Sequence, residues 1–97
     1  MRRDAVLEAL AARLPVIESR FGVRSLALFG SYARDEARPD SDVDLLVEFS
    51  RPLSFTDYMG LIEYLEGELG TGVEVATPGK LKPRIRPYVE RDLIRVA

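Results

Sequence analysis

Apolar residues in the first fifth of the chain recur at helical spacing. Successive apolar residues lie three or four positions apart, at Leu7, Leu10, Leu14, Ile17 and Phe21. This spacing places their side chains on one stripe of a helix. Proline is tolerated in the first turn of a helix but not in its interior. Pro15 therefore predicts a break near Leu14 within residues 3–21, followed by a second short helix that ends at Gly22.

Three shorter apolar runs predict strands. They are residues 24–29 (RSLALF), 43–49 (VDLLVEF) and 72–76 (GVEVA). Each run is bounded by residues typical of turns, and the runs are rich in residues that suit strands. Residues 94–96 could add a final short strand. The stretch from Arg38 to Ser41 is predicted to be a loop, because Pro39 and Asp40 favour turns.

Helical patterns fill the remaining stretches. The longest helix is predicted between Ser54 and Gly70, and Ser54 with Asp57 resembles a capping box. A short helix is expected over Tyr32 to Ala37, capped by Ser31, and a last helix is expected to start at Pro83. The elements together predict one α/β (α+β) domain over residues 1–97, with a small mixed sheet of three to four strands flanked by helices.

Two aspartates in the second predicted strand are the first sign of chemistry. Asp42 and Asp44 flank Val43, so their side chains point to the same face of the strand. Two carboxylates on one face of an apolar strand are costly unless a cation lies between them. Mg²⁺ is the natural candidate, because it binds through one or two carboxylates together with substrate phosphates.

A Gly-Ser pair at the end of the first predicted strand supplies a complementary feature. Gly30 lets the backbone turn sharply and approach a ligand closely, and Ser31 offers a hydroxyl and a backbone N–H to an anion. Ser31 can meet Asp42 only if the first two strands are antiparallel. The pattern therefore predicts phosphate donors that face a metal-bound carboxylate pair.

Composition narrows the chemistry further. The 97 residues include no cysteine and no histidine, which excludes thiolate zinc sites, cysteine nucleophiles and imidazole bases. An apolar fraction of 46% argues against disorder. No signal peptide or membrane span is visible, so a cytoplasmic protein without membrane contact is expected.

Charge is unevenly distributed along the chain. Residues 1–79 carry a net charge of −6 and residues 80–97 a net charge of +4. These charges either belong to solvated helix faces, or the basic tail meets a triphosphate or an acidic partner surface. A nucleic-acid-binding protein would usually be more basic overall, so no direct nucleic-acid contact is expected.

The stretch FGSYARDEARPDSDVDLLVEF carries a Gly-Ser-x₁₀-Asp-x-Asp pattern. This pattern resembles the DNA polymerase β-like nucleotidyltransferases, and in particular the minimal nucleotidyltransferase (MNT) family. The resemblance implies the polymerase β-like fold, with two Mg²⁺ ions and an ATP or another nucleoside triphosphate. By this resemblance the metal ligands and catalytic residues are Asp42, Asp44 and Glu74, and Gly30 and Ser31 bind the nucleotide. Arg34 and Arg38 flank this site. Each is expected either to bind the nucleotide by neutralising the charge of the leaving group, or to form a surface salt bridge.

Two positions depart from the resembled pattern. Asp35 stands where the family has glycine, which we expect to change backbone freedom more than chemistry. Glu74 stands where the family more often has aspartate as its third carboxylate. A lone glutamate on a short strand usually faces solvent. Glu48, on the same strand face as Asp42 and Asp44, is the competing acid.

The resemblance also implies a function. MNT proteins resemble the antitoxin of HEPN–MNT toxin–antitoxin pairs, which implies AMP transfer to a tyrosine hydroxyl of a HEPN toxin and a hetero-oligomer with that partner. Two alternatives stay open from the sequence. The chain could neutralise its partner by binding alone, or it could transfer the nucleotide to a small molecule.

Overall fold

The N-terminal apolar stripe forms two helices, as Pro15 predicts. In the computed structural model, which describes residues 1–97, α1 (Arg3–Ala12) is followed after one residue by α2 (Leu14–Phe21). Pro15 lies in the first turn of α2, where its missing N–H leaves no hydrogen bond unmade. Gly22 ends α2 in the left-handed conformation, with φ of 70°, as the sequence predicts.

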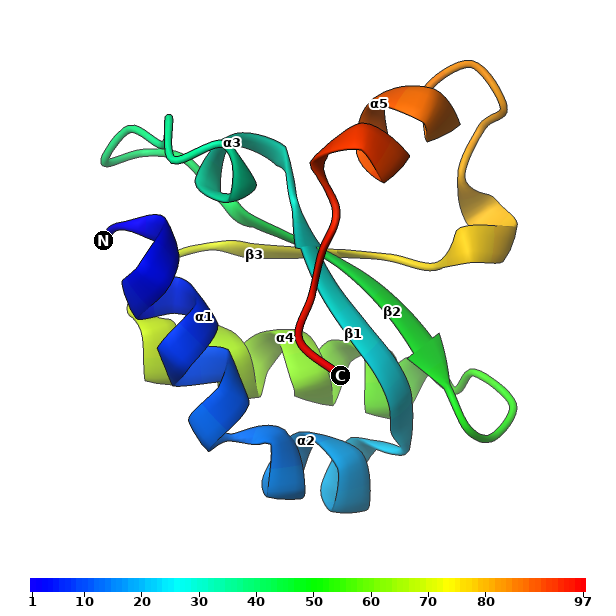
Figure 1. Cartoon of the computed structure of the whole chain (residues 1–97). Coiled ribbons are helices and arrows are strands. Elements are labelled where there is room, and N and C mark those ends of the chain that lie inside the picture. Colours follow the sequence, from blue (N-terminus) through cyan, green and yellow to red (C-terminus); the bar gives the residue numbers. More distant parts are fainter.

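A four-stranded mixed sheet forms the centre of the molecule (Figure 1). Its strands are β1 (Val23–Phe29), β2 (Val43–Phe49), β3 (Val73–Ala76) and β4 (Ile94–Arg95). Their order is β3-β2-β1-β4, with β1 antiparallel to both β2 and β4, and β2 parallel to β3. The predicted fold class and the antiparallel pairing of the first two strands are confirmed.

The helix after β1 differs from its prediction. It is α3 (Gly30–Ala33), which begins two residues early, with Phe29 rather than Ser31 at the N-cap. The reason is Gly30, whose φ of 77° lets the chain pass directly from strand to helix. The helix ends early because the chain reaches Asp35, which has a φ of 59°. This left-handed conformation agrees with the expectation that Asp35 occupies a position suited to glycine.

The remaining helices are α4 (Phe55–Leu69), the 3₁₀ turn η1 (Pro78–Lys80) and α5 (Arg86–Asp92). The predicted start of the last helix at Pro83 is wrong. A helix that began at Pro83 would place Pro87 beyond the first turn, where its missing N–H would leave out one of the helical hydrogen bonds. A start at Arg86 keeps Pro87 inside the first turn, where no such bond is needed. None of the helices is long and apolar enough to span a lipid bilayer.

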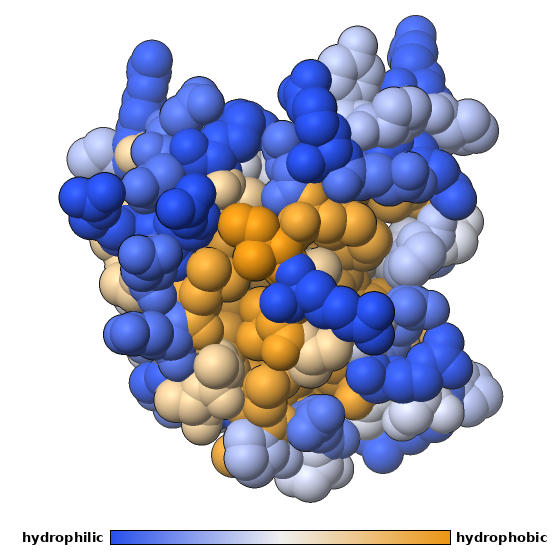
Figure 2. All heavy atoms as spheres, in the orientation of Figure 1, coloured by the Kyte–Doolittle hydropathy of each residue, from blue (hydrophilic) through white to orange (hydrophobic).

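The helices α1, α2 and α4 cover one face of the sheet. Alternate strand residues on that face are fully buried, for example Leu26, Leu28 and Leu45, and they pack with buried residues of the helices. The side chains between them, such as Phe29 and Leu46, are only partly covered. In Figure 2, apolar side chains gather over the strands and the C-terminal segment, and charged side chains surround them. One face of the sheet therefore forms the core and the other remains open.

Side chains of α4 occupy the outer edge of β3. Glu66 accepts a hydrogen bond from the Val73 backbone N–H at 3.1 Å, and the Tyr58 hydroxyl donates to the Val75 carbonyl at 3.0 Å. Both bonds satisfy polar backbone groups that an edge strand would otherwise offer to another chain. They also fix α4 beside the strand that carries Glu74.

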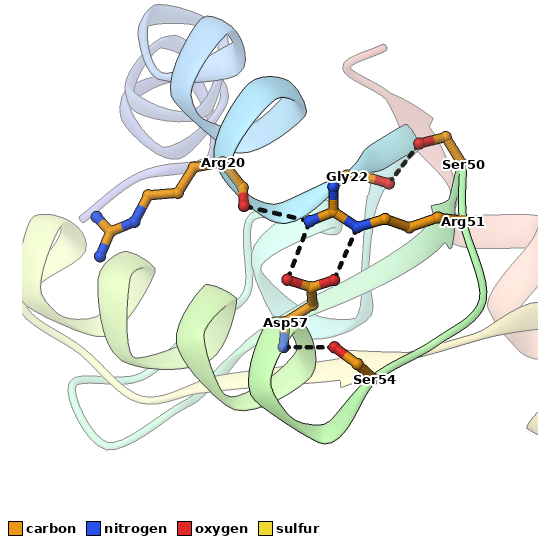
Figure 3. A network of polar contacts seen from close by, with 6 residues as sticks. All are labelled: Arg20, Gly22, Ser50, Arg51, Ser54 and Asp57. Atoms are coloured by element: carbon orange, nitrogen blue, oxygen red, sulfur yellow. Dashed lines mark hydrogen bonds and ion pairs between the residues drawn. The ribbon is translucent and has the colours of Figure 1, made fainter.

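A polar network ties the start of α4 to the end of α2 (Figure 3). Ser54 caps α4 by accepting from the Asp57 N–H at 3.0 Å. The Asp57 carboxylate does not accept a hydrogen bond from the Ser54 backbone N–H, as it would in a capping box. It accepts two hydrogen bonds from Arg51, at 2.9 and 3.0 Å, and the same guanidinium donates to the Arg20 carbonyl at 3.4 Å. The predicted box is thus half formed, because a charged partner from the preceding loop competes for the carboxylate.

Candidate active site

The turn after β1 brings backbone and carboxylate into close contact. At Gly30, a Cβ atom would overlap the Oδ2 atom of Asp44, and the φ of 77° is itself unfavourable for other residues. Two independent constraints therefore require glycine here. The turn also places Ser31 in the first turn of α3, where no hydrogen bond within the chain engages its hydroxyl.

Three carboxylates lie beside this turn. Asp44 on β2 is the register partner of Glu74 on β3, and the two carboxyl groups are near enough for Glu74 to raise the pKa of Asp44. Asp42 precedes β2, and its Oδ1 atom lies where a Cβ atom of Gly72 would stand. The structure thus brings Asp42, Asp44 and Glu74 together at one end of β2 and β3, next to Gly30.

Electrostatics set Asp44 apart from the other acids. Burial raises the pKa of its carboxyl group to about 6, and the proximity and negative charge of Glu74 act in the same direction. The charge of Asp42 adds to this effect, whereas the positive charge of Arg34 opposes it. The cluster therefore holds more negative charge than its surroundings compensate, which favours a bound cation.

The two arginines of the predicted nucleotide site differ in their surroundings. Arg34 donates to Asp92 of α5 at 2.7 Å, and the Asp92 side chain is only 10% exposed. Its charge reaches Asp44, so Arg34 belongs to the cluster. Arg38 lies on the exposed loop before β2, and its guanidinium makes no hydrogen bond or ion pair. The structure does not bring Arg38 into contact with the carboxylates.

The competing acid, Glu48, has other partners. It accepts from Ser25 at 2.8 Å and from Arg24 at 3.0 Å. These contacts, the Ser25 hydrogen bond foremost, lower the pKa of the Glu48 carboxyl group. Glu48 lies four positions beyond Asp44 along the strand, or roughly 13 Å away. Glu48 therefore lies at the far end of β2 and is already paired.

The donor set suits a magnesium site that is completed by substrate. No three acidic side chains surround a single point closely enough to form a protein cage for a metal ion. Mg²⁺ does not need such a cage, because it commonly takes one or two carboxylates and fills its other positions with water and phosphate oxygens. The carboxylate oxygens of Asp42, Asp44 and Glu74 are ligands of the right kind, and their mutual repulsion would be relieved by a cation.

Two residues of the site were missed by sequence reasoning. Gly72 makes room for Asp42, and a glycine directly before a strand is a known sign of close backbone approach. Asp92 holds Arg34 from 58 residues away in sequence. No local signal marks Asp92, because its role depends on how α5 packs against α3.

Comparison with known sequences agrees with this geometry. Residues 12–96 match the model of the nucleotidyltransferase domain family. The chain is 42% identical over 93 residues to the protein adenylyltransferase MntA of Thermococcus cleftensis, an alignment that covers 96% of this chain and 94% of that protein. It is 40% identical over 94 residues to a provisionally assigned protein adenylyltransferase of Methanocaldococcus jannaschii, which covers 94% of both chains.

Solved structures show the same architecture. A provisionally assigned minimal nucleotidyltransferase has a TM-score of 0.79 and 38% identity, covering 97% of this chain and 95% of that one. An MNT antitoxin in complex with a tri-AMPylated HEPN toxin of Shewanella oneidensis has a TM-score of 0.67, covering 94% of this chain and 71% of the matched chain. Its 15% identity supports a shared fold only. This chain therefore belongs to the nucleotidyltransferase domain family, among the minimal nucleotidyltransferases related to MntA.

Proposed function

We propose that this chain is a protein adenylyltransferase that moves AMP from ATP to a tyrosine hydroxyl of a HEPN toxin, and so acts as its antitoxin. The observation that carries the proposal is the contact of Asp44 with both Glu74 and Gly30. A carboxylate cluster beside the Gly30 turn supports binding of a metal-bound triphosphate at this end of the sheet. The name of the Thermococcus relative supports adenylyl transfer to protein, and the Shewanella complex supports a HEPN toxin as the partner.

In this proposal the turn after β1 binds the triphosphate. The backbone at Gly30 and the N–H and hydroxyl of Ser31 would hold the β- and γ-phosphates, because these groups are free to donate. Arg34, held by Asp92, would neutralise charge on the pyrophosphate as it leaves. Arg38 would add a second positive charge for the same phosphates.

The carboxylates would act on the other side of the reacting phosphorus. Two Mg²⁺ ions held by Asp42, Asp44 and Glu74 would stabilise the attacking and leaving oxygens. The acceptor oxygen forms a bond to the α-phosphorus, the bond to the bridging oxygen breaks, and pyrophosphate departs. Glu74 would take the proton of the acceptor hydroxyl. The chain has no histidine, so positioning and electrostatics supply most of the catalysis.

Labelled ATP tests the proposed reaction. The chain is incubated with ATP labelled at the α-phosphate, Mg²⁺ and the candidate HEPN partner, which is the product of the adjacent open reading frame. We expect label on that protein, at a tyrosine identified by mass spectrometry. Label on a small molecule of a cell extract, with none on the HEPN protein, would instead support the small-molecule alternative. A chain that labels nothing while it still silences the toxin would support neutralisation by binding.

The Glu74→Gln variant separates catalysis from binding. Glutamine is nearly the same shape, but it is a poor Mg²⁺ ligand and no base. We expect transfer to fall by at least about a hundredfold, which is the low end of general-base effects, while the variant still binds its partner. The variant is then titrated against the toxin, and the remaining RNase activity shows whether neutralisation is catalytic. Catalytic neutralisation predicts that the variant fails at substoichiometric amounts, whereas neutralisation by contact predicts normal silencing at one-to-one.

A further inference from the structure

A groove runs along β3, away from the triphosphate turn. Two adjoining hollows of about 310 and 380 Å³ share Tyr58 and Val75. The first is lined in part by Phe29 and Glu74, so it begins at the candidate active site. The second extends to Phe55 and Lys80. We call the two hollows together the β3 groove.

The order of the strands places the β3 groove on the Glu74 side of the candidate active site. Glu74 lies on β3, and Gly30 follows β1, with Asp44 on β2 between them. The triphosphate side and the Glu74 side are therefore opposite flanks of Asp44. A group that enters through the β3 groove reaches Glu74 without crossing the Gly30 turn, as an acceptor hydroxyl must.

The far end of the groove exposes apolar surface. Phe55 is 79% exposed and Leu53 is 44% exposed, and both line the second hollow. A large aromatic side chain left in water at the mouth of an apolar hollow is typical of an interaction site. The groove is thus suited to an apolar side chain of a partner.

A basic segment continues from the same end. Lys80 lines the second hollow, and Lys82 and Arg84 follow it on the exposed chain between η1 and α5. None of these three cations has an acidic partner, whereas Arg34 and Arg51 are ion-paired elsewhere in the fold. Unpaired positive charge beside an apolar hollow calls for an acidic ligand.

We propose that the β3 groove receives an extended acidic segment of the acceptor protein. Its acceptor hydroxyl lies at Glu74, an apolar side chain fills the hollow at Phe55, and acidic side chains pair with Lys80, Lys82 and Arg84. Lys80 follows Glu74 by six residue steps, which span at most roughly 20 Å, the reach of about six extended residues. This inference rests on the proposed function, and it names the surface that selects the acceptor.

Charge reversal at the groove tests the inference. For Lys80→Glu combined with Lys82→Glu, we expect the Kd for the purified HEPN protein to rise at least about tenfold at low salt. The KM for that protein should rise in parallel, while the KM for ATP and the kcat at saturating partner stay within twofold. The difference from wild type should shrink as salt is raised, because exposed charges are screened.

A matched control carries the same change of charge elsewhere. Arg3→Glu combined with Arg20→Glu alters residues of α1 and α2 that do not line the β3 groove. We expect both constants of this control to equal those of wild type. A groove variant that behaves like the control would overturn the inference. So would a rise confined to the KM for ATP, because the basic segment would then serve the triphosphate.

The apolar end of the groove is tested separately. Phe55→Ala is compared with Val16→Ala, which truncates an exposed apolar residue on α2. We expect Phe55→Ala to weaken partner binding about fivefold or more, as for a central aromatic contact, with no effect of Val16→Ala. Unchanged binding in Phe55→Ala overturns this contact, and sedimentation that reveals a dimer of this chain broken by Phe55→Ala would assign the groove to self-association.

Binding and transfer give separable outcomes. If wild type transfers no label to the HEPN protein, the proposed function fails, and the Kd values still decide whether the groove docks that protein. If wild type transfers label but the groove variants bind and react normally, only the docking inference fails. RNA binding that is lost in the Lys80→Glu, Lys82→Glu variant, with protein binding intact, would also overturn it.

Discussion

At the scale of single residues, Gly30 combines backbone strain with lack of space. We expect Gly30→Ala to destabilise the fold by about 1–2 kcal/mol, the cost of a left-handed conformation, and to reduce transfer at least tenfold, because the new methyl group displaces Asp44. Urea unfolding and label transfer measure the two effects. Gly67 is the control, since nothing lies within 4 Å of a Cβ atom there. Gly67→Ala should stabilise α4 by roughly 0.5–1 kcal/mol and leave transfer unchanged.

A second prediction at this scale concerns the charge of Asp44. Its pKa is raised from 3.8 to about 6, so the folded state binds a proton that the unfolded state releases. With EDTA present, the stability of wild type should therefore fall as the pH rises through this range. Asp44→Asn removes the charge, so this variant should be more stable than wild type at pH ~7.5, with a smaller difference near pH ~4.5. Urea midpoints that differ equally at both pH values would contradict this account.

At the scale of elements, the start of α4 depends on a single side-chain cap. Ser54→Ala leaves the Asp57 N–H without its acceptor, and the loss of such a cap costs about 0.5–2 kcal/mol. Ser54→Asp keeps an acceptor and should retain most of the stability. Ser19→Ala on α2 serves as the comparison, because the Ser19 hydroxyl donates only to the Pro15 carbonyl of its own helix. Equal urea midpoints for Ser54→Ala and Ser19→Ala would show that the cap contributes nothing.

At the scale of the whole molecule, we expect local stability against unfolding to be highest in the sheet and lower in the C-terminal segment. The central cluster of 17 buried residues includes residues of β1, β2 and α4. The only buried residue of α5 is Val89, and it lies outside that cluster. Hydrogen exchange should therefore be slowest in β1, β2 and α4 and faster in residues 80–92. Equal protection of residues 80–92 and β2 would mean that α5 unfolds only with the core.

The sequence by itself determined the features that depend on neighbours along the chain. The apolar periodicity, the break at Pro15 and the ends of α4 follow from local propensity and capping. The Gly-Ser turn and the Asp-x-Asp pair were likewise visible as a pattern, because each is set by a few consecutive residues. The exact ends of α3 and α5 were not, since they depend on backbone angles at Gly30 and on the competing demands of two prolines.

The tertiary structure decided which distant groups meet. Glu74 and Glu48 were both candidates in the sequence, and strand pairing separates them. Parallel pairing of β2 with β3 sets Glu74 beside Asp44, whereas antiparallel pairing with β1 gives Glu48 the partners Ser25 and Arg24. The physical reason is that a hydrogen bond or ion pair depends on a few ångströms of separation, which sheet register and helix packing set between residues far apart in sequence.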